Sequence, residues 1–219
     1  LREVHGGAGA GAGAGIRACM LALRTISNLA VESSARRELG QEELMEQLMC
    51  VAGGSEEEDE LKLTVSVMEV LSMERDVQER LAGRGWDEKL VALFRTVKTR
   101  LEEGKFSQEG AREISSHILI VLCRLASLPT ADLQSKKFLL RFAAGELATE
   151  LPPPSSLLDL IVRLSIHSEL EDEFLQRAVS LLSSLLPEHQ DPFLVQKILM
   201  ALLNVSASSE AARRSMLNL

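Results

Sequence analysis

The sequence predicts an all-α fold in which short helical units are stacked in series as an α-solenoid. The main evidence is a repeat: residues 21–39 read LALRTISNLAVESSARREL, and a shift of 42 residues places residues 63–81, LTVSVMEVLSMERDVQERL, on them without a gap. The paired positions include Leu23 and Val65, Leu29 and Leu71, Glu32 and Glu74. A period of about 40 to 47 residues that carries only helical signals is typical of repeats made of two or three helices.

A third copy of the pattern lies at residues 201–217. There Asn204 falls on Asn28 and, after a one-residue gap, Arg213–Arg214 fall on Arg36–Arg37. Because the same helical pattern occurs at both ends of the chain, we expect the repeat architecture to extend along its length.

The composition also favours helices over sheets. Hydrophobic residues make up 46% of the chain and charged residues 26%, whereas aromatic residues are only 3% and tyrosine is absent. Strands are enriched in aromatic and β-branched residues, which this chain supplies poorly. We therefore expect an aliphatic core between interlocking helices.

The charge balance excludes one class of partner. The formal net charge is -8 and the pI is about 5.2, whereas proteins that bind the phosphate backbone usually carry a clustered basic surface. We expect no nucleic-acid partner.

The cysteines indicate a reducing compartment. Cys19, Cys50 and Cys123 are odd in number, far apart and set in apolar helical sequence, a pattern that fits buried free thiols rather than disulfides. No stretch reaches the roughly 18 apolar residues that a membrane-spanning helix needs. These observations predict a cytoplasmic protein, with a nuclear location as the alternative, and no transmembrane segment. The start at Leu1 suggests a piece of a longer protein.

The chain begins with a segment that cannot bury side chains. The Gly/Ala-rich tract at 6–15 predicts a flexible linker or loop over residues 1–15. Residues 16–219 are expected to form a single repeat domain of about four to five repeats. Apolar periodicity and turn residues predict helices over 16–28, 35–39, 42–51, 61–73, 76–81, 86–101, 109–128, 132–144, 146–151, 156–167, 169–186 and 191–206.

Helix ends are marked by residues with known preferences. Ser33 or Ser34 can cap the helix at 35–39, the spacing of Ser156 and Asp159 matches a capping box, and Asp191 before Pro192 suits the last helix start. Breaks are expected at Gly53–Gly54, at Gly145 and at the prolines 152–154, which favour an extended connection. The acidic run at 55–60 suits the positive end of a helix better than a metal site, because contiguous acids on a helix point in different directions.

No motif for catalysis, metals or cofactors is present. The four histidines are far apart in sequence, no cysteine or histidine pair has ligand spacing, and there is no nucleophile elbow or phosphate-binding glycine loop. His117 lies within a helical stripe and is expected to be packed or hydrogen bonded. We therefore expect a protein that is not an enzyme and that carries no cofactor.

With this organisation the chain resembles the armadillo family of helical repeats. The segments SNLA at 27–30 and LNVSAS at 203–208 are similar to the end of that family's third helix. With Leu29 as anchor, the equivalent positions are Leu71, Leu125, Leu164 and Val205. The resemblance implies a right-handed superhelix in which each repeat has one short and two longer helices, and the third helices line a concave groove.

The same resemblance selects candidate contact residues. In the family's nuclear-import receptors an Asn of the third helix and a Trp four residues earlier grip basic peptides, and here the Trp positions hold Arg24, Ser66, Ile120, Asp159 and Met200. The tryptophan ladder is thus absent. The expected groove residues are Arg24, Asn28, Arg124, Arg163 and Asn204, and the arginines suit a partner with acidic character.

Two alternatives stay open at this point. Asn28 and Asn204 can instead bond backbone groups at a helix end. If residues 155–167 form a second rather than a third helix, Ser180 and Ser184 take the place of Arg163. Arg36 and Arg37 are expected on an outer edge in either case.

The function implied is a protein-interaction scaffold or adaptor whose groove binds a peptide segment or a folded domain. The alternative is a regulatory factor on an armadillo scaffold, such as a nucleotide-exchange stimulator for a small GTPase or a chaperone cofactor. A homo-oligomer that forms through exposed terminal repeats is a further possibility.

Overall fold

The computed structural model describes residues 12–149, 153–166, 179–180, 182–186 and 191–216. This part of the chain is helical and contains no β-strand, so the all-α prediction is confirmed for it. The helices are α1 (Ala12–Leu29), α2 (Ser33–Leu39), α3 (Glu42–Gly54), α4 (Glu58–Leu71), α5 (Arg75–Leu81), α6 (Trp86–Glu102), α7 (Gln108–Ala126), α8 (Leu133–Leu147), α9 (Ser155–Ser165), α11 (Pro192–Ser208) and α12 (Glu210–Met216). None of these helices is long and apolar enough to span a bilayer.

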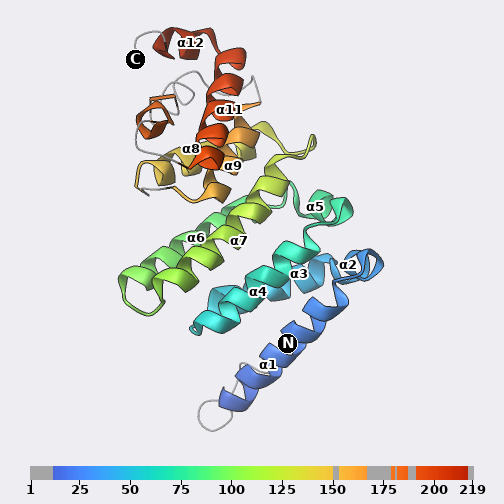
Figure 1. The fold of residues 1–219 in the computed structure, drawn as a ribbon. Coiled ribbons are helices and arrows are strands. Elements are labelled where there is room, and N and C mark those ends of the chain that lie inside the picture. Colours follow the sequence, from blue (N-terminus) through green and yellow to red (C-terminus); the bar gives the residue numbers. More distant parts are fainter. Residues whose placement is uncertain (1–11, 150–152, 167–178, 181, 187–190, 217–219) are drawn as a thin grey trace. The chain divides into compact units, whose positions relative to one another are not determined.

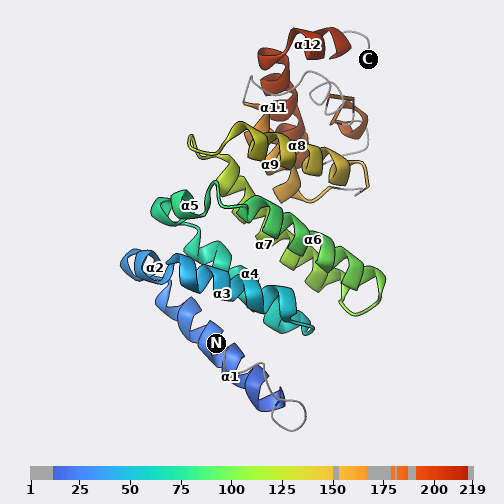
Figure 2. The same cartoon turned by 180° about the vertical axis from the view of Figure 1, so that it is seen from behind.

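The chain divides into two compact units, Leu1–Arg124 and Leu125–Leu219. In the first unit the short helices α2 and α5 are each followed by two longer ones. Figures 1 and 2 show α1 beside α4, α3 against α4, and α6 paired with α7, with α2 and α5 together at one end of the long helices. In the second unit α11 packs against α9, α8 also contacts α9, and α12 follows α11. The single array expected over 16–219 and its number of repeats stay predictions.

The cores are mainly aliphatic, as the composition predicts. Fully buried side chains of the first unit include Leu23, Leu48, Leu61, Met68, Leu71, Ile114 and Ile118, together with Trp86 and Phe94. Those of the second unit include Leu157, Leu158, Leu160, Leu164, Ile198, Ala201 and Val205. The repeat anchors Leu71, Leu125, Leu164 and Val205 are all buried, whereas Leu29 is exposed.

Three helices extend past the glycines or the linker expected to bound them. Helix α1 begins at Ala12 rather than near Ile16, α3 continues through Gly53 to Gly54, and α8 passes through Gly145 to Leu147. An interior glycine costs only about 1 kcal/mol relative to alanine, and burial of apolar neighbours such as Ala52 and Leu147 offsets that cost. The break predicted at Gly145 was therefore wrong, whereas α3 does end at the glycine pair, at Gly54.

Capping differs from the prediction at two helix starts. Glu32 rather than a serine is the N-cap of α2, and the Ser33 hydroxyl donates instead to Glu74 Oε1 at 2.8 Å. The extended residue Pro154 precedes α9 without a side-chain cap, and Ser156 is buried, so the capping box was wrong. Asp191 accepts from Phe193 N at 2.9 Å with Pro192 in the first turn, which confirms the third capping prediction.

The remaining helix predictions differ in smaller ways. The helix expected at 146–151 merges into α8, and residues 150–151 lie outside the described part. Of the helix expected at 169–186, residues 179–180 and 182–185 are helical, and residues 169–178 lie outside the described part. Cys19, Cys50 and Cys123 are free thiols, but Cys50 is exposed because the buried face of α3 passes through Met45, Leu48, Val51 and Ala52.

Candidate functional site

Arg24 and Asn28 lie one turn apart on the exposed side of α1. Burial of Cys19, Leu23 and Ala30 fixes the opposite side of this helix in the core. Neither Arg24 nor Asn28 makes a side-chain hydrogen bond or ion pair with the residues that the structure describes. Both side chains are thus available to a ligand.

Arg124, in contrast, is already bonded within the protein. Its Nη1 donates to the Ser72 hydroxyl at 2.8 Å and to the main-chain oxygen of Glu69, and its Nη2 lies 3.3 Å from Glu69 Oε1. The side chain is three-quarters buried, and this burial lowers its pKa against the opposing attraction of Glu69. Arg124 therefore anchors α7 to the last turn of α4.

Glu69 is the centre of a larger polar cluster between α4 and α7. Its Oε2 lies 2.5 Å from His117 Nδ1, and the other nitrogen of that ring lies 3.9 Å from Glu113 Oε1. The hydrogen bond from His117 is the main cause that holds the pKa of Glu69 below its usual value, with Arg124 adding to it and burial opposing it. Lys62 extends the cluster by pairing with Glu113. We call Lys62, Glu69, Ser72, Glu113, His117 and Arg124 the α4–α7 cluster.

Of the two groove residues of the second unit, one is bonded and one is exposed. Asn204 Nδ2 on α11 donates to the main-chain oxygen of Val162 near the end of α9 at 3.3 Å. This is the backbone role that the sequence left open for Asn204. Arg163 is exposed, with no side-chain bond to any described residue.

Beside Asn204, Lys197 of α11 reaches α9. Its Nζ lies 2.6 Å from Asp159 Oδ2 and 2.5 Å from the Ser155 hydroxyl. Together with Asn204 it ties α11 to α9 by polar bonds at both ends of α9.

A second junction, missed from the sequence, forms around Glu74. Its carboxylate accepts from Ser33, from Arg36 Nε at 2.8 Å and from Arg37 Nε at 3.3 Å. Arg36 also donates to the main-chain oxygens at the end of α1, those of Ala30 and Val31. The Ser33 bond is the largest cause that lowers the pKa of Glu74. The repeat alignment of Glu32 with Glu74 was the one signal that marked this position.

These polar bonds join residues that lie about one sequence period apart. Those centred on Glu69 and Glu74 join residues 37 to 55 positions apart, and Lys89–Glu46 and Asn204–Val162 join residues 43 and 42 apart. This range includes the 42-residue period of the sequence. Within each unit, then, the bonds connect segments that the period predicts to be neighbouring repeats.

Exposure follows the same register. The two positions that the sequence register assigns to a groove, defined by Arg24 and Asn28, are exposed or half-buried in each predicted repeat. They are Arg24, Ser66, Ile120, Asp159, Met200 and Asn28, Val70, Arg124, Arg163, Asn204. Ser180 and Ser184 of the alternative register are exposed as well. Each unit thus offers side chains along this register to solvent.

Two observations concern metal binding and the reactivity of Cys19. In the described ranges no group of three or more histidine, cysteine or acidic side chains could hold a metal ion. Burial and the neighbouring Glu60 raise the pKa of the Cys19 thiol to about 11, so this thiol is protonated at neutral pH and is a poor nucleophile. No family model matches the chain, and no curated protein or solved structure matches it.

Proposed function

We propose that this chain is a protein-interaction scaffold, an armadillo-like right-handed superhelical array whose third helices bind a protein partner along a concave surface. The observation that carries the proposal is the solvent exposure of side chains at equivalent positions of the predicted repeats. The positions equivalent to Arg24 and Asn28 are exposed or half-buried, while the anchors next to them are buried from Leu71 onward. A stripe of accessible side chains on an otherwise packed repeat is the arrangement that a binding surface requires.

The described contacts narrow the candidate binding residues. Arg124 and Asn204 are bonded to their own chain, so in this proposal they support the helices rather than contact the partner. Arg24, Asn28 and Arg163 are exposed and keep their donors free of described partners. Arginine presents a planar fork of donors to carboxylates, so the partner is an acidic segment or an acidic face of a folded domain. Three free thiols suit a reducing compartment, the cytoplasm or the nucleus.

The experiment is a binding assay with labelled peptides. A fluorescein-labelled Asp/Glu-rich peptide and a Lys-rich peptide of equal length are titrated with the chain, and anisotropy is measured. We expect binding of the acidic peptide only. Arg24→Glu or Arg163→Glu should weaken it by about fivefold or more, because an exposed ion pair contributes up to about 1 kcal/mol and reversal adds repulsion.

Arg95→Glu is the matched control. Arg95 is also exposed and without a described side-chain partner, but it lies on α6, outside the groove register. Equal losses for Arg24→Glu and Arg95→Glu would show a general charge effect and contradict the proposal, as would equal binding of the acidic and basic peptides.

A further inference from the structure

Helix α1 exposes a face whose counterpart in the next repeat is buried. By the 42-residue shift Leu29 corresponds to Leu71, yet Leu29 is 53% exposed and Leu71 is 0% exposed. In the same way Thr25 is exposed and its counterpart Val67 is buried. The burial differs because α1 packs against α4. In the described part of the chain no helix covers this face of α1.

Helix α11 of the second unit exposes apolar side chains at positions whose counterparts in α1 point toward the following repeat. With Asn204 placed on Asn28, Leu199 falls on Leu23 and Leu203 on Ser27. Leu23 is fully buried in α1, which packs against α4, whereas Leu199 is 51% and Leu203 68% exposed.

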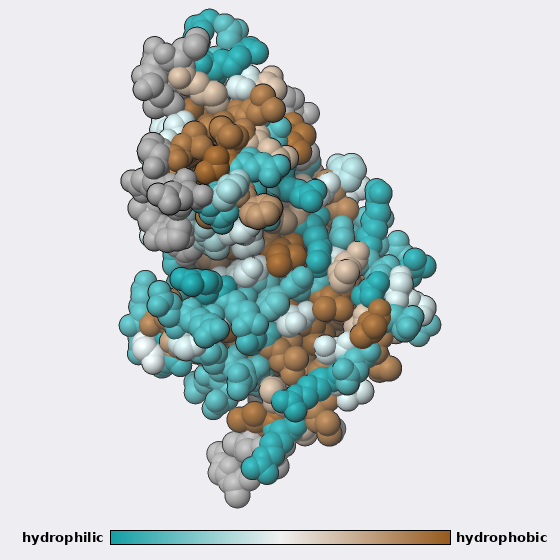
Figure 3. Space-filling view, in the orientation of Figure 1, coloured by the Kyte–Doolittle hydropathy of each residue, from teal (hydrophilic) through white to brown (hydrophobic). Residues whose placement is uncertain are grey.

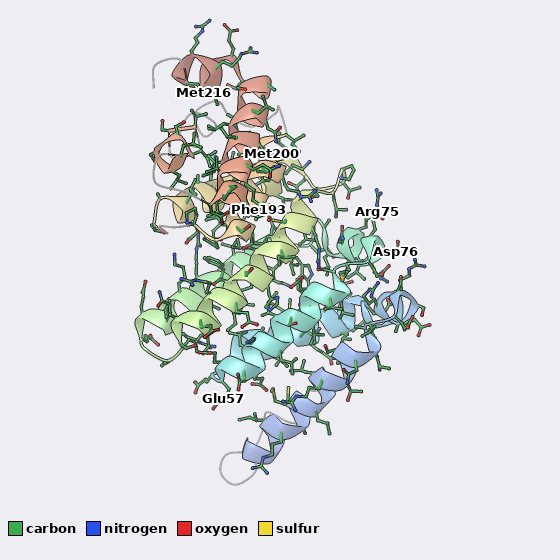
Figure 4. The ribbon with its side chains drawn as sticks, viewed as in Figure 1. Glu57, Arg75, Asp76, Phe193, Met200 and Met216 are labelled. Atoms are coloured by element: carbon green, nitrogen blue, oxygen red, sulfur yellow. The ribbon has the colours of Figure 1, made fainter. Side chains whose placement is uncertain are left out.

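The α4 counterpart of Ser27 and Leu203 is Glu69, which bonds to His117 and Arg124 of α7. These register positions of α1 and α4 therefore face the following repeat, and on α11 they are open. Figure 3 shows hydrophobic side chains gathered over α11, and Figure 4 places Phe193 and Met200 along the same helix.

Under the same repeat alignment, α2 and α12 are flanked by or contain residues of opposite charge. Inside the chain, Arg36 and Arg37 bind Glu74 of the next repeat. Glu32, the counterpart of Glu74, is exposed and its carboxylate has no partner among the described residues.

Arg213 and Arg214 are the counterparts of the arginine pair. Arg213 is exposed, without a described side-chain partner, and Arg214 pairs only with Glu210 of its own helix. One end thus carries the carboxylate and the other the arginines.

We propose that a second copy of this chain docks head to tail, with α11 and α12 of one copy on α1 and α2 of the next. In this contact Leu199 and Leu203 cover the face of α1 at Thr25 and Leu29, and Arg213 and Arg214 bind Glu32 as Arg36 and Arg37 bind Glu74. Such a contact uses different surfaces on the two copies, so it propagates unless it closes into a ring.

The proposed contact differs from the proposed groove. Arg24 lies about 100° or more around α1 from both Thr25 and Leu29, since successive helical residues are rotated by about 100°. Loss of one contact therefore leaves the other testable.

The test uses two blocked variants of the full chain. Leu29→Asp blocks the head and Leu203→Asp blocks the tail, and both positions are exposed in the single chain, so folding should persist and circular dichroism checks it. In sedimentation velocity the native chain should rise above 24.0 kDa with concentration, and each variant alone should stay at that mass. Their equimolar mixture should form a species of twice the chain mass, because one intact head and one intact tail remain.

The outcomes separate the proposal from its alternatives. A native chain of constant mass, a mixture that stays monomeric, or a blocked variant that self-associates as well as the native chain would each overturn it. Met73→Asp, at another exposed apolar side chain of the first unit, is the control and should associate like the native chain. Binding of the acidic peptide by Leu203→Asp should match the native value whether or not the chains associate.

A charge exchange tests the pairing directly. Glu32→Arg should weaken association by about fivefold or more. Adding a chain with Arg213→Glu and Arg214→Glu should restore association to the Glu32→Arg chain, because the exchanged charges attract again. If both variants are folded and association is not restored, the proposed pairing of Glu32 with Arg213 and Arg214 is contradicted.

Discussion

Arg124 and Glu69 join two successive repeats through both the side chain and the main chain. Arg124 Nη2 lies 3.3 Å from Glu69 Oε1, and Nη1 donates to the main-chain oxygen of the same residue. The carbonyls of a helix's last turn lack intrahelical partners, so Arg124 also caps α4. A side chain predicted to lie in the groove is thus bonded within the protein.

Arg124→Ala should destabilise the first unit by about 2 kcal/mol. The change removes the bonds of Arg124 to the carboxylate and the main-chain oxygen of Glu69, although Ser72 Oγ still donates to that oxygen at 2.7 Å. Hydrogen bonds to charged groups contribute about 1.5–3 kcal/mol. Urea unfolding followed by circular dichroism measures the loss. Arg112→Ala, at an exposed arginine of the same helix with no described side-chain partner, should change stability by less than about 0.5 kcal/mol. Equal effects of the two changes would contradict the role of Arg124.

The free energy of unfolding should fall in acid because Glu69 becomes protonated. Its pKa is depressed in the folded state, so its contribution is complete above the ordinary glutamate value of 4.5 and is lost as the pH falls through the lower folded value. The Glu69→Gln variant should therefore lose less stability than the native chain between neutral pH and this acid window. Parallel pH curves for the two proteins would contradict the assignment.

Glu74→Ala should loosen α2 without unfolding the chain. The substitution removes the acceptor that Ser33, Arg36 and Arg37 share. Hydrogen exchange measured by mass spectrometry should be faster in α2 and at the end of α1. Glu79→Ala is the control. Among the described residues Glu79 pairs only with Arg75 of its own helix, so this change should leave exchange in α2 unchanged.

Two glycine-to-alanine substitutions should change the stability of the protein in opposite directions. A Cβ at Gly40 would lie 2.3 Å from Val77 Cγ2 and 2.8 Å from the Arg36 oxygen, so Gly40→Ala should destabilise by about 1–3 kcal/mol. Gly53 lies within α3 with no atom near its added Cβ, so Gly53→Ala should stabilise by about 0.5–1 kcal/mol. Thermal unfolding of both variants measures the difference, and a shared sign would contradict it.

The thiols should react in a fixed order. Cys50 is exposed and Cys19 is buried, and the pKa of the Cys19 thiol is raised to about 11, so its thiolate is scarce below that pH. In the native chain a thiol reagent such as DTNB should modify Cys50 within the mixing time and Cys19 only after denaturant is added. Cys50→Ser should abolish the rapid phase, and a rapid phase that persists would contradict the order.

The helices could be predicted well because their signals are local. Apolar residues at three-to-four spacing and an acidic run before Leu61 mark α4 in the sequence, and the observed helix starts at Glu58. The error at Gly145 occurred where burial of its neighbours outweighed a weak local preference. The capping error at Ser33 had the same origin, because Glu74, 41 positions later, bonds its hydroxyl.

The candidate site could be predicted only in part. The repeat register identified side chains that reach solvent, among them Arg24, Asn28 and Arg163. It did not separate them from Arg124 and Asn204, because a free and a bonded side chain occupy the same register position. Arg124 and Glu69 are 55 positions apart, and the repeat period predicts which segments are neighbours but not which of their side chains bond.

The sequence by itself determined the helical class, the aliphatic core and the 42-residue period, since these follow from side-chain spacing and composition. Only the tertiary structure decided which polar residues are bonded within the protein. Burial and hydrogen bonding depend on which helices become neighbours, so Arg124 supports α4 and α7 while Arg24, at the groove register on α1, remains open to a ligand.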